Sequence, residues 1–160
     1  MAKILVVFYS RTGKTRQAAS DIAADLEADS EEIIDKKSRK GLFGFLSGGR
    51  DAMKKNLTEI KPLGKDPAEY DLVIVGSPVW GGDLTPAIRT FLTWHTDKLR
   101  RFAFFITSDD TDPSLVAESA AQAAGKEPVA VTGWNTQDLR TKLSYREKLA
   151  LFTNHIRGIV

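Results

Sequence analysis

The strongest sequence signal in this chain is Phe8-Tyr9-Ser10-Arg11-Thr12-Gly13-Lys14-Thr15. An apolar run from Ile4 to Phe8 comes directly before it, and such a run predicts a strand buried in a sheet. Apolar side chains then recur at helical spacing after it, namely Ala18, Ala19, Ile22, Ala23 and Leu26. The stretch is therefore predicted to join a buried strand, residues 3–9, to an amphipathic helix, residues 13–28.

The composition of this loop indicates a site for an anion. Backbone N–H groups at the start of a helix lack partners within the helix and carry partial positive charge. Ser10, Thr12 and Thr15 add hydroxyl donors, and the loop contains no carboxylate that could ligate a metal. We interpret it as a phosphate-binding loop, with an ordinary strand-to-helix turn capped by hydroxyls as the alternative.

Two familiar phosphate loops do not fit this stretch. A Walker A loop needs a glycine five residues before Gly13, where the chain has Phe8. The dinucleotide fingerprint needs three spaced glycines, and this loop has one. The loop therefore belongs to neither class.

Length and composition set further bounds. We expect the 160 residues to form a single domain, residues 1–160. The absence of cysteine excludes disulfides, thiolate metal sites and a cysteine nucleophile, and two histidines make a histidine-rich metal site an unexpected feature. We predict no metal site and no catalytic residue set. No apolar run is long enough for a transmembrane segment, so we expect a cytoplasmic protein.

The order of elements predicts an α/β fold. Strands are expected at 3–9, 32–35, 71–76, 102–106 and 129–131, with helices opened by Thr85-Pro86, by Asp112-Pro113 and by a capping box at Ser144 and Glu147. Right-handed crossovers would arrange these strands as a doubly wound five-stranded parallel sheet with helices on both faces. Numbered along the chain, the expected strand order is 2-1-3-4-5, and a ligand would lie where the order reverses, beside strands 1 and 3.

A second motif follows the third predicted strand, with the sequence Gly76-Ser77-Pro78-Val79-Trp80-Gly81-Gly82-Asp83. Its glycines allow close backbone approach, and Trp80 offers a flat apolar face that could stack on a planar cofactor or pack on the protein's own core. Together with the loop after the first strand, this motif resembles the flavodoxin family. The resemblance follows the order of elements along essentially the whole chain.

That resemblance implies FMN as the cofactor. Ser10, Arg11, Thr12, Gly13, Lys14 and Thr15 would hold its 5′-phosphate, and Pro78, Val79, Trp80 and Gly81 would contact the isoalloxazine. The loop after the fourth strand, with Thr107, Ser108 and Asp109, would offer backbone N–H groups to the pyrimidine edge, while Asp112 is expected to cap the next helix. The implied function is electron transfer through the quinone, semiquinone and hydroquinone forms of the flavin. The alternative is an NAD(P)H-dependent FMN oxidoreductase of the quinone-reductase type.

A basic insertion, residues 36–65, lies between the second and third strands. Its first part, residues 36–55, carries seven basic side chains against Asp51 alone. We expect it to be irregular, with a helix near Arg50–Leu57. Three functions are open to it: docking a redox partner protein (a reductase or an acceptor), receiving the phosphates of a nicotinamide nucleotide, or touching a membrane surface. A solvated insertion whose aromatic side chains cover the sheet edge or the flavin is the fourth possibility, and we expect no nucleic-acid partner.

Overall fold

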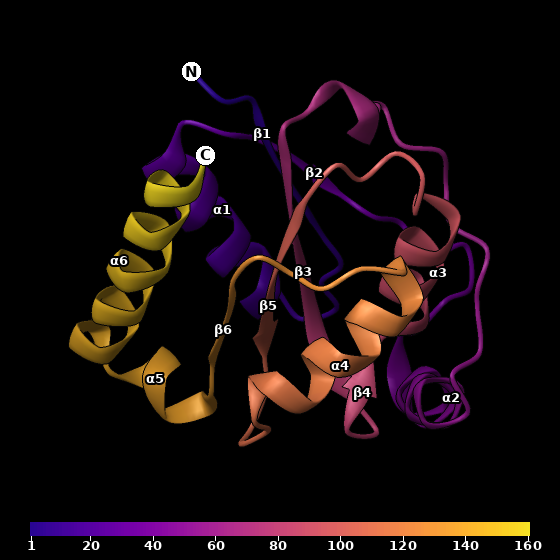
Figure 1. Cartoon of the computed structure of the whole chain (residues 1–160). Coiled ribbons are helices and arrows are strands. Elements are labelled where there is room, and N and C mark those ends of the chain that lie inside the picture. The colour runs from indigo at the N-terminus through magenta and orange to yellow at the C-terminus, as the bar shows by residue number, and fades with distance from the viewer.

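The computed structural model describes residues 1–160 and contains a parallel sheet with helices on both faces (Figure 1). The strands are ordered β2-β1-β3-β5-β6, and the short β4 pairs antiparallel with the end of β3. This is the predicted order, because β4 lies outside the parallel series. The bounds of the strands are Ile4–Phe8 for β1, Asp29–Glu32 for β2, Leu72–Trp80 for β3, Asp83–Leu84 for β4, Phe102–Thr107 for β5 and Val131–Trp134 for β6.

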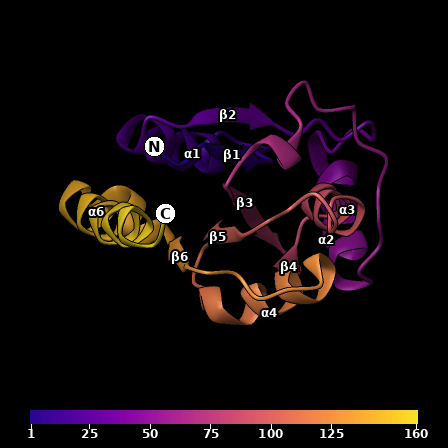
Figure 2. The same cartoon turned by 45° about the horizontal axis from the view of Figure 1, so that its top comes forward.

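Two pairs of helices cover the two faces of the sheet (Figure 2). Helices α1 (Lys14–Leu26) and α6 (Lys142–Ile159) pack on one face, and α3 (Pro86–Trp94) and α4 (Pro113–Ala124) pack on the other. Each face has its own cluster of buried apolar side chains. The unbroken apolar runs of β1, β3 and β5 are therefore buried from both sides, as expected for a covered parallel sheet.

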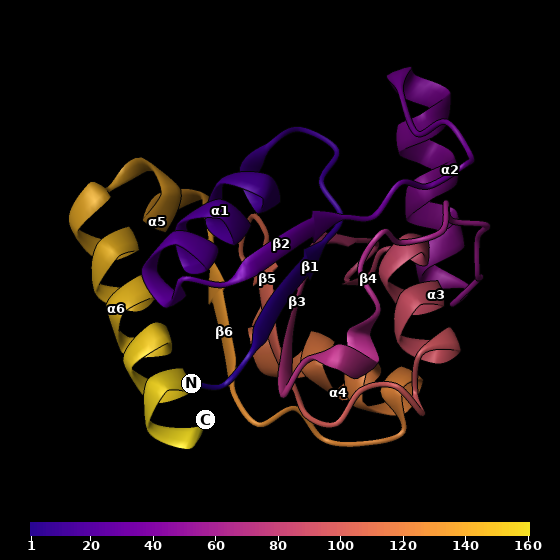
Figure 3. The ribbon, with the colours of Figure 1, turned by 90° about the horizontal axis from the view of Figure 1, so that it is seen from above.

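The remaining helices are short or peripheral. Helix α5 (Thr136–Arg140) leads into α6, and η1 (Pro67–Glu69) is a single 3₁₀ turn before β3. Helix α2 (Gly41–Met53) lies at the carboxyl ends of the strands, next to α3 and at the corner of the molecule away from α6 (Figure 3). No helix is both long enough and apolar enough to cross a membrane.

The position predicted for the second strand is wrong. The sequence predicts 32–35, but β2 spans Asp29–Glu32 and pairs with β1 from Leu5 to Phe8. The two isoleucines that suggested a strand lie just beyond this pairing, where Ile33 N–H still donates to Phe8 C=O at 2.7 Å. From Asp35 the chain pairs instead with residues near Ile60, through an isolated antiparallel bridge. Pairing partners, rather than apolarity, therefore set the limits of this edge strand.

Three other boundaries also differ from the sequence predictions. The last strand spans Val131–Trp134 rather than 129–131, because these residues are the ones in register with β5. Helix α6 begins at Lys142, and Ser144 donates from Oγ to Asp138 instead of capping a helix. The capping box that the structure contains lies nine residues earlier, at the start of α5, between the N-cap Asn135 and Asp138. Within the basic insertion the helix is Gly41–Met53, not 50–57.

Candidate functional site

The structure brings the loops after β1, β3 and β5 together at the carboxyl ends of the strands. The rings of Tyr9 and Trp80 meet edge to face with centroids 5.4 Å apart. The hydroxyls of Thr15 and Thr107 form a buried hydrogen bond of 2.8 Å. Residues from three separate parts of the sequence thus share one site at the point where the strand order reverses.

The loop after β1 presents free backbone donors. Gly13 is the N-cap of α1 in a left-handed conformation with φ of 100°, and its N–H donates to Ser10 Oγ at 3.0 Å. The next amides, of Lys14, Thr15 and Arg16, have no hydrogen-bond partner in the chain, and no acidic residue lies in the first turn of α1. A helix start with unpaired N–H groups and no side-chain cap has the chemistry that a phosphate needs.

The side chains of this loop point in different directions. Thr12 and Lys14 are exposed beside the free amides. Arg11 is instead attached to the segment that leads into α2, because its Nε donates to Arg39 C=O at 2.8 Å and its guanidinium also reaches Gly41 C=O at 3.3 Å. The loop after β1 and the start of α2 are therefore held side by side.

The motif around Trp80 is not the connecting loop that the sequence predicts. Pro78, Val79 and Trp80 continue β3 and turn back through Gly81 and Gly82 into β4, with Trp80 paired to Asp83. The extension forms because β5 pairs with β3 as far as Pro78 and β4 pairs with Val79 and Trp80, partners that periodicity alone does not reveal. All three extension residues are half-buried, so their side chains are still available at the rim of the site.

A pocket of about 730 Å³ lies between this hairpin and α2. Val79, Trp80 and Gly81 form one side of it, and Asp109 reaches it from the loop after β5. The other side belongs to α2, through Phe45, Leu46, Gly49, Arg50, Met53 and the adjacent Lys54. These α2 residues were not among the predicted cofactor contacts, although the apolar side chains among glycines in 41–49 indicate a segment that packs on a neighbouring surface.

Glycines allow α2 and the hairpin to approach each other. Gly81 has φ of 56°, and a Cβ there would lie 2.4 Å from Met53 Cγ and 2.8 Å from the carbonyl oxygen of Gly49. A Cβ on Gly48 would lie 2.7 Å from the ring of Trp80. All three separations are shorter than a van der Waals contact, so glycine is required at both positions for this packing.

The loop after β5 completes the site with polar groups. Thr107 is buried and bonded to Thr15, while Ser108 Oγ accepts from the N–H of Thr111 at 3.0 Å. Asp109 accepts from Thr136 Oγ1 at 2.9 Å and borders the pocket. Asp112 caps α4 by accepting from Ser114 N–H, as the sequence predicts.

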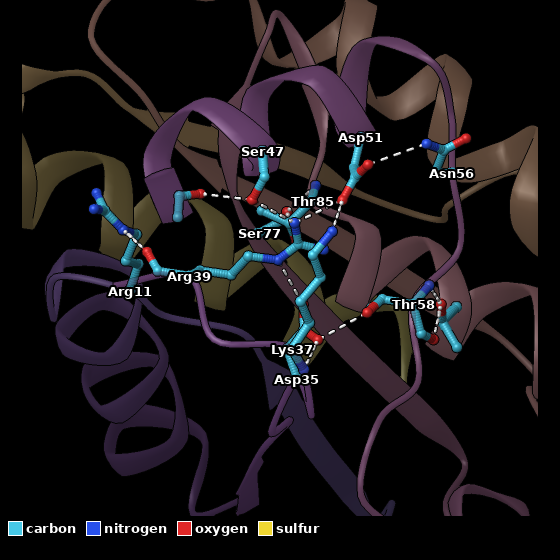
Figure 4. A network of polar contacts seen from close by, with 12 residues as sticks. Arg11, Asp35, Lys37, Arg39, Ser47, Asp51, Asn56, Thr58, Ser77 and Thr85 are labelled. Atoms are coloured by element: carbon cyan, nitrogen blue, oxygen red, sulfur yellow. Dashed lines mark hydrogen bonds and ion pairs between the residues drawn. The ribbon is translucent and has the colours of Figure 1, made fainter. Parts of the chain in front are cut away.

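A buried ionic cluster fixes the segment between β2 and α2 (Figure 4). Arg39 is 4% exposed and donates to Asp35 at 3.1 Å and to Asp51 at 2.6 Å. The same carboxylates accept from four further groups: the Lys37 N–H at 2.9 Å, Lys37 Nζ at 3.1 Å, Asn56 Nδ2 at 3.1 Å and Thr58 Oγ1 at 2.8 Å. The cluster ties α2 to the chain on both sides of it, so α2 is a fixed wall of the pocket.

The electrostatics of this cluster extend into the site. Burial would raise the pKa of Asp51, but hydrogen bonds from Arg39, Asn56 and Lys37 outweigh it and hold that pKa well below its ordinary value. Burial, and then the charge of Asp35, raise the pKa of Tyr9 to about 12. Tyr9 therefore stays neutral, and its ring supports Trp80 without bringing a charge to the pocket.

Comparison with solved structures identifies the arrangement as a flavodoxin-like fold. A flavoprotein from Lactobacillus acidophilus, solved in complex with FMN, matches with a TM-score of 0.74 at 23% identity over 88% of this chain and 97% of its own. Flavodoxin 2 from Bacillus cereus in its oxidised form matches with a TM-score of 0.59 at 21% identity over 99% of this chain and 100% of its own. A flavodoxin, WrbA-like protein from Agrobacterium tumefaciens matches with a TM-score of 0.56 at 17% identity over 99% of each chain.

These likenesses confirm the predicted fold. No protein-family model and no curated protein matches the sequence. No group of three or more His, Asp or Glu side chains is placed to hold a metal ion.

Proposed function

We propose that this protein binds FMN and transfers electrons through it. The observation that carries the proposal is the adjacency of two complementary features: unpaired amides at the start of α1 and an apolar pocket bordered by Trp80. Tyr9 against Trp80 and Arg11 over the ring of Phe45 join the loop after β1 to the pocket lining. FMN combines a phosphate with a flat ring system, so it would occupy both. The solved neighbour with FMN in its structure supports the choice of this flavin over other phosphorylated rings.

The roles of the residues follow from their positions. The amides of Lys14 and Thr15, with the hydroxyls of Ser10 and Thr12, would hold the phosphate without a metal. Val79, Trp80 and Gly81 border the pocket and would lie against the ring, with Asp109 at its polar edge. Pro78 and Ser108 do not border the pocket, so they would support these neighbours rather than contact the ring. When bound, FMN supplies the chemistry of reversible electron uptake, while α2 keeps water from one side of the pocket.

Titration of the flavin-free protein with FMN and with riboflavin tests this proposal. We expect FMN to bind and riboflavin, which lacks the phosphate, to bind at least about 100-fold more weakly, because hydrogen bonds to a charged group contribute about 1.5–3 kcal/mol each. Thr12→Val should weaken FMN binding about tenfold or more and leave riboflavin binding unchanged. Thr93→Val, at an exposed threonine of α3, is the matched control. Equal affinity for both flavins would disprove the phosphate role of the loop.

The ring contact is tested separately. Trp80→Ala should weaken the binding of both flavins, since it removes an apolar face of the pocket. Trp94→Ala is the control, because Trp94 is exposed at the end of α3 and does not border the pocket. If both substitutions have the same effect, the ring does not lie against Trp80.

The electron-carrier function is favoured over an NAD(P)H-dependent oxidoreductase by the size of the site. One pocket of about 730 Å³ lies beside Trp80, and a flavin ring would fill much of it. Stepwise photoreduction that accumulates the one-electron-reduced flavin, with slow bleaching by NAD(P)H alone, is expected for the carrier. Rapid bleaching by NADH or NADPH would establish the reductase instead. As a carrier it would act in the cytoplasm with redox partner proteins.

A further inference from the structure

Helix α2 has its large apolar side chains on the outside. The residues of α2 that face the protein are Gly44, Gly48, Asp51 and Ala52, which are small or charged. Leu42, Leu46 and Met53 recur at helical spacing on the opposite side and are 71%, 57% and 70% exposed. A surface helix normally has the reverse arrangement, so this face is suited to contact something outside the chain.

The proposed flavin site does not account for this face. Phe45, Leu46 and Met53 border the pocket, and a bound ring would cover part of them. Leu42 and Phe43 do not border it, and Phe43 is the more exposed of the two at 88%. Two large apolar side chains therefore remain in water whether or not the pocket is filled.

Unpaired cations surround the apolar face. Arg39, Lys37 and Lys36 form ion pairs with carboxylates of the chain. Four others form none, namely Lys40, Arg50, Lys54 and Lys55. They lie at the start, in the last turn and just after the end of α2. The occupant of this face must therefore be anionic as well as apolar.

A second hollow beside α2 indicates which kind of molecule could contact the exposed apolar face of this helix. It has a volume of about 640 Å³ and is bordered by Lys40 and Arg50, by the hydroxyls of Ser38 and Ser47, and by the ring of Phe43. Cations and hydroxyls next to an exposed apolar side chain match an amphiphile, whose anionic head group continues into an acyl chain. An acidic protein surface would pair with the cations but would leave Leu42 and Phe43 without a matching partner.

The shape of this region also favours a lipid surface. Helix α2 lies at a corner of the molecule, beyond α3 and on the side away from α6 (Figure 3). A second copy of the chain is disfavoured, because two α2 faces in contact would bring together four unpaired cations from each copy. We propose that α2 docks this protein on an anionic lipid surface, with Leu42 and Phe43 inserted at the head-group boundary and the unpaired cations on lipid phosphates.

Flotation of the whole protein with lipid vesicles tests this proposal. At about 0.1 M salt we expect binding to phosphatidylcholine vesicles that contain about one quarter phosphatidylglycerol, and little binding to phosphatidylcholine alone. The double variant Leu42→Gln, Phe43→Gln should lower partitioning at least about tenfold, since two large apolar side chains no longer enter the bilayer. Leu115→Gln with Leu151→Gln is the matched control, because both leucines are exposed on helices away from α2.

Separate variants test the contribution of the unpaired cations to vesicle binding. Lys40→Glu with Lys55→Glu should lower binding to the anionic vesicles at least about tenfold, whereas Lys142→Glu with Arg146→Glu on α6 should change it much less. Three outcomes would overturn the proposal: no binding to the anionic vesicles, binding unchanged by the α2 variants, or a dimer in sedimentation that Leu42→Gln, Phe43→Gln dissociates. The circular dichroism spectrum of each variant, compared with that of the parent protein, checks that the variant is folded. The test does not depend on flavin binding.

Discussion

The loop after β1 and the segment after β2 lie side by side at the same edge of the sheet, but different forces hold them. The loop is fixed by backbone geometry: Gly13 in a left-handed conformation, one hydrogen bond to Ser10, and the helix that follows. The segment from Asp35 to Asn56 is fixed by side chains, through the ionic cluster around Arg39. Only the support by backbone geometry, in the loop after β1, leaves backbone N–H groups free to bind a ligand.

This difference separates the tasks of the two regions. Helix α2 contains Gly41, Gly44, Gly48 and Gly49, so its intrinsic helix propensity is low. Its place beside Trp80 depends on the cluster, which joins residues before and after it. The loop after β1 has no such dependence, because helix α1 packs on the sheet through its own apolar stripe. We therefore expect damage to the cluster to affect the pocket wall while the loop after β1 stays intact.

The largest effect should come from Arg39→Met. This substitution leaves Asp35 and Asp51 buried without their main counter-charge, which costs about 3–5 kcal/mol of unfolding free energy in comparable cases. Urea denaturation measures it. Arg157→Met is the control, because the Arg157–Asp25 pair is roughly half exposed on both sides and such pairs contribute about 0–1 kcal/mol. A loss below about 1 kcal/mol for Arg39→Met would show that the cluster does not hold α2.

The pH dependence of the unfolding free energy should reveal how much the ionised carboxylate of Asp51 contributes to stability. Its pKa in the folded state is held below the ordinary value of about 3.9, so its stabilisation is complete above that pH and is lost as the pH falls further. Asp51→Asn, which cannot ionise, should cost about 1–3 kcal/mol at pH 7, and this deficit should shrink as the pH is lowered below about 4. Urea denaturation across that range gives the comparison. A deficit that is the same at every pH would mean that the charge of Asp51 contributes nothing.

The features that could be predicted from the sequence are those fixed by local contacts, as in the loop after β1. The loop after β1 and its helix depend on neighbours within a few residues, so hydroxyls, one glycine and apolar spacing predict them. The strand order follows from buried apolar runs and right-handed crossovers, and it is confirmed. The convergence of Trp80 with the loop after β1 follows from that order.

The rest depends on contacts between distant residues. The positions of β2 and β6 are set by register with β1 and β5, which apolarity alone does not specify. The extension of β3 requires β5 as a partner as far as Pro78 and β4 beyond it. Helix α2 requires Arg39 to meet Asp35 and Asp51 in a glycine-rich segment that local propensity marks as irregular. Six of the ten residues that line the pocket belong to α2 or directly follow it, and the sequence does not mark them as cofactor contacts.

Replacing a glycine by alanine should change the free energy of unfolding in opposite directions in the two regions. These are the smallest of the expected effects. Gly13→Ala puts a side chain at a φ of 100°, a backbone conformation that is disfavoured for L-residues. It should lower the unfolding free energy by about 1–2 kcal/mol. Gly49→Ala lies inside α2, where a Cβ meets no atom within 4 Å, and should raise it by about 0.5–1 kcal/mol through helix propensity.

Because neither new methyl group makes a close contact, the difference between these two variants isolates backbone conformation in each region. Urea denaturation of the two proteins in parallel gives that difference. If Gly49→Ala is destabilising, α2 does not keep its helical conformation in solution. If Gly13→Ala is neutral, the loop after β1 can leave the left-handed conformation, and the free amides at the start of α1 are not fixed in place for a phosphate.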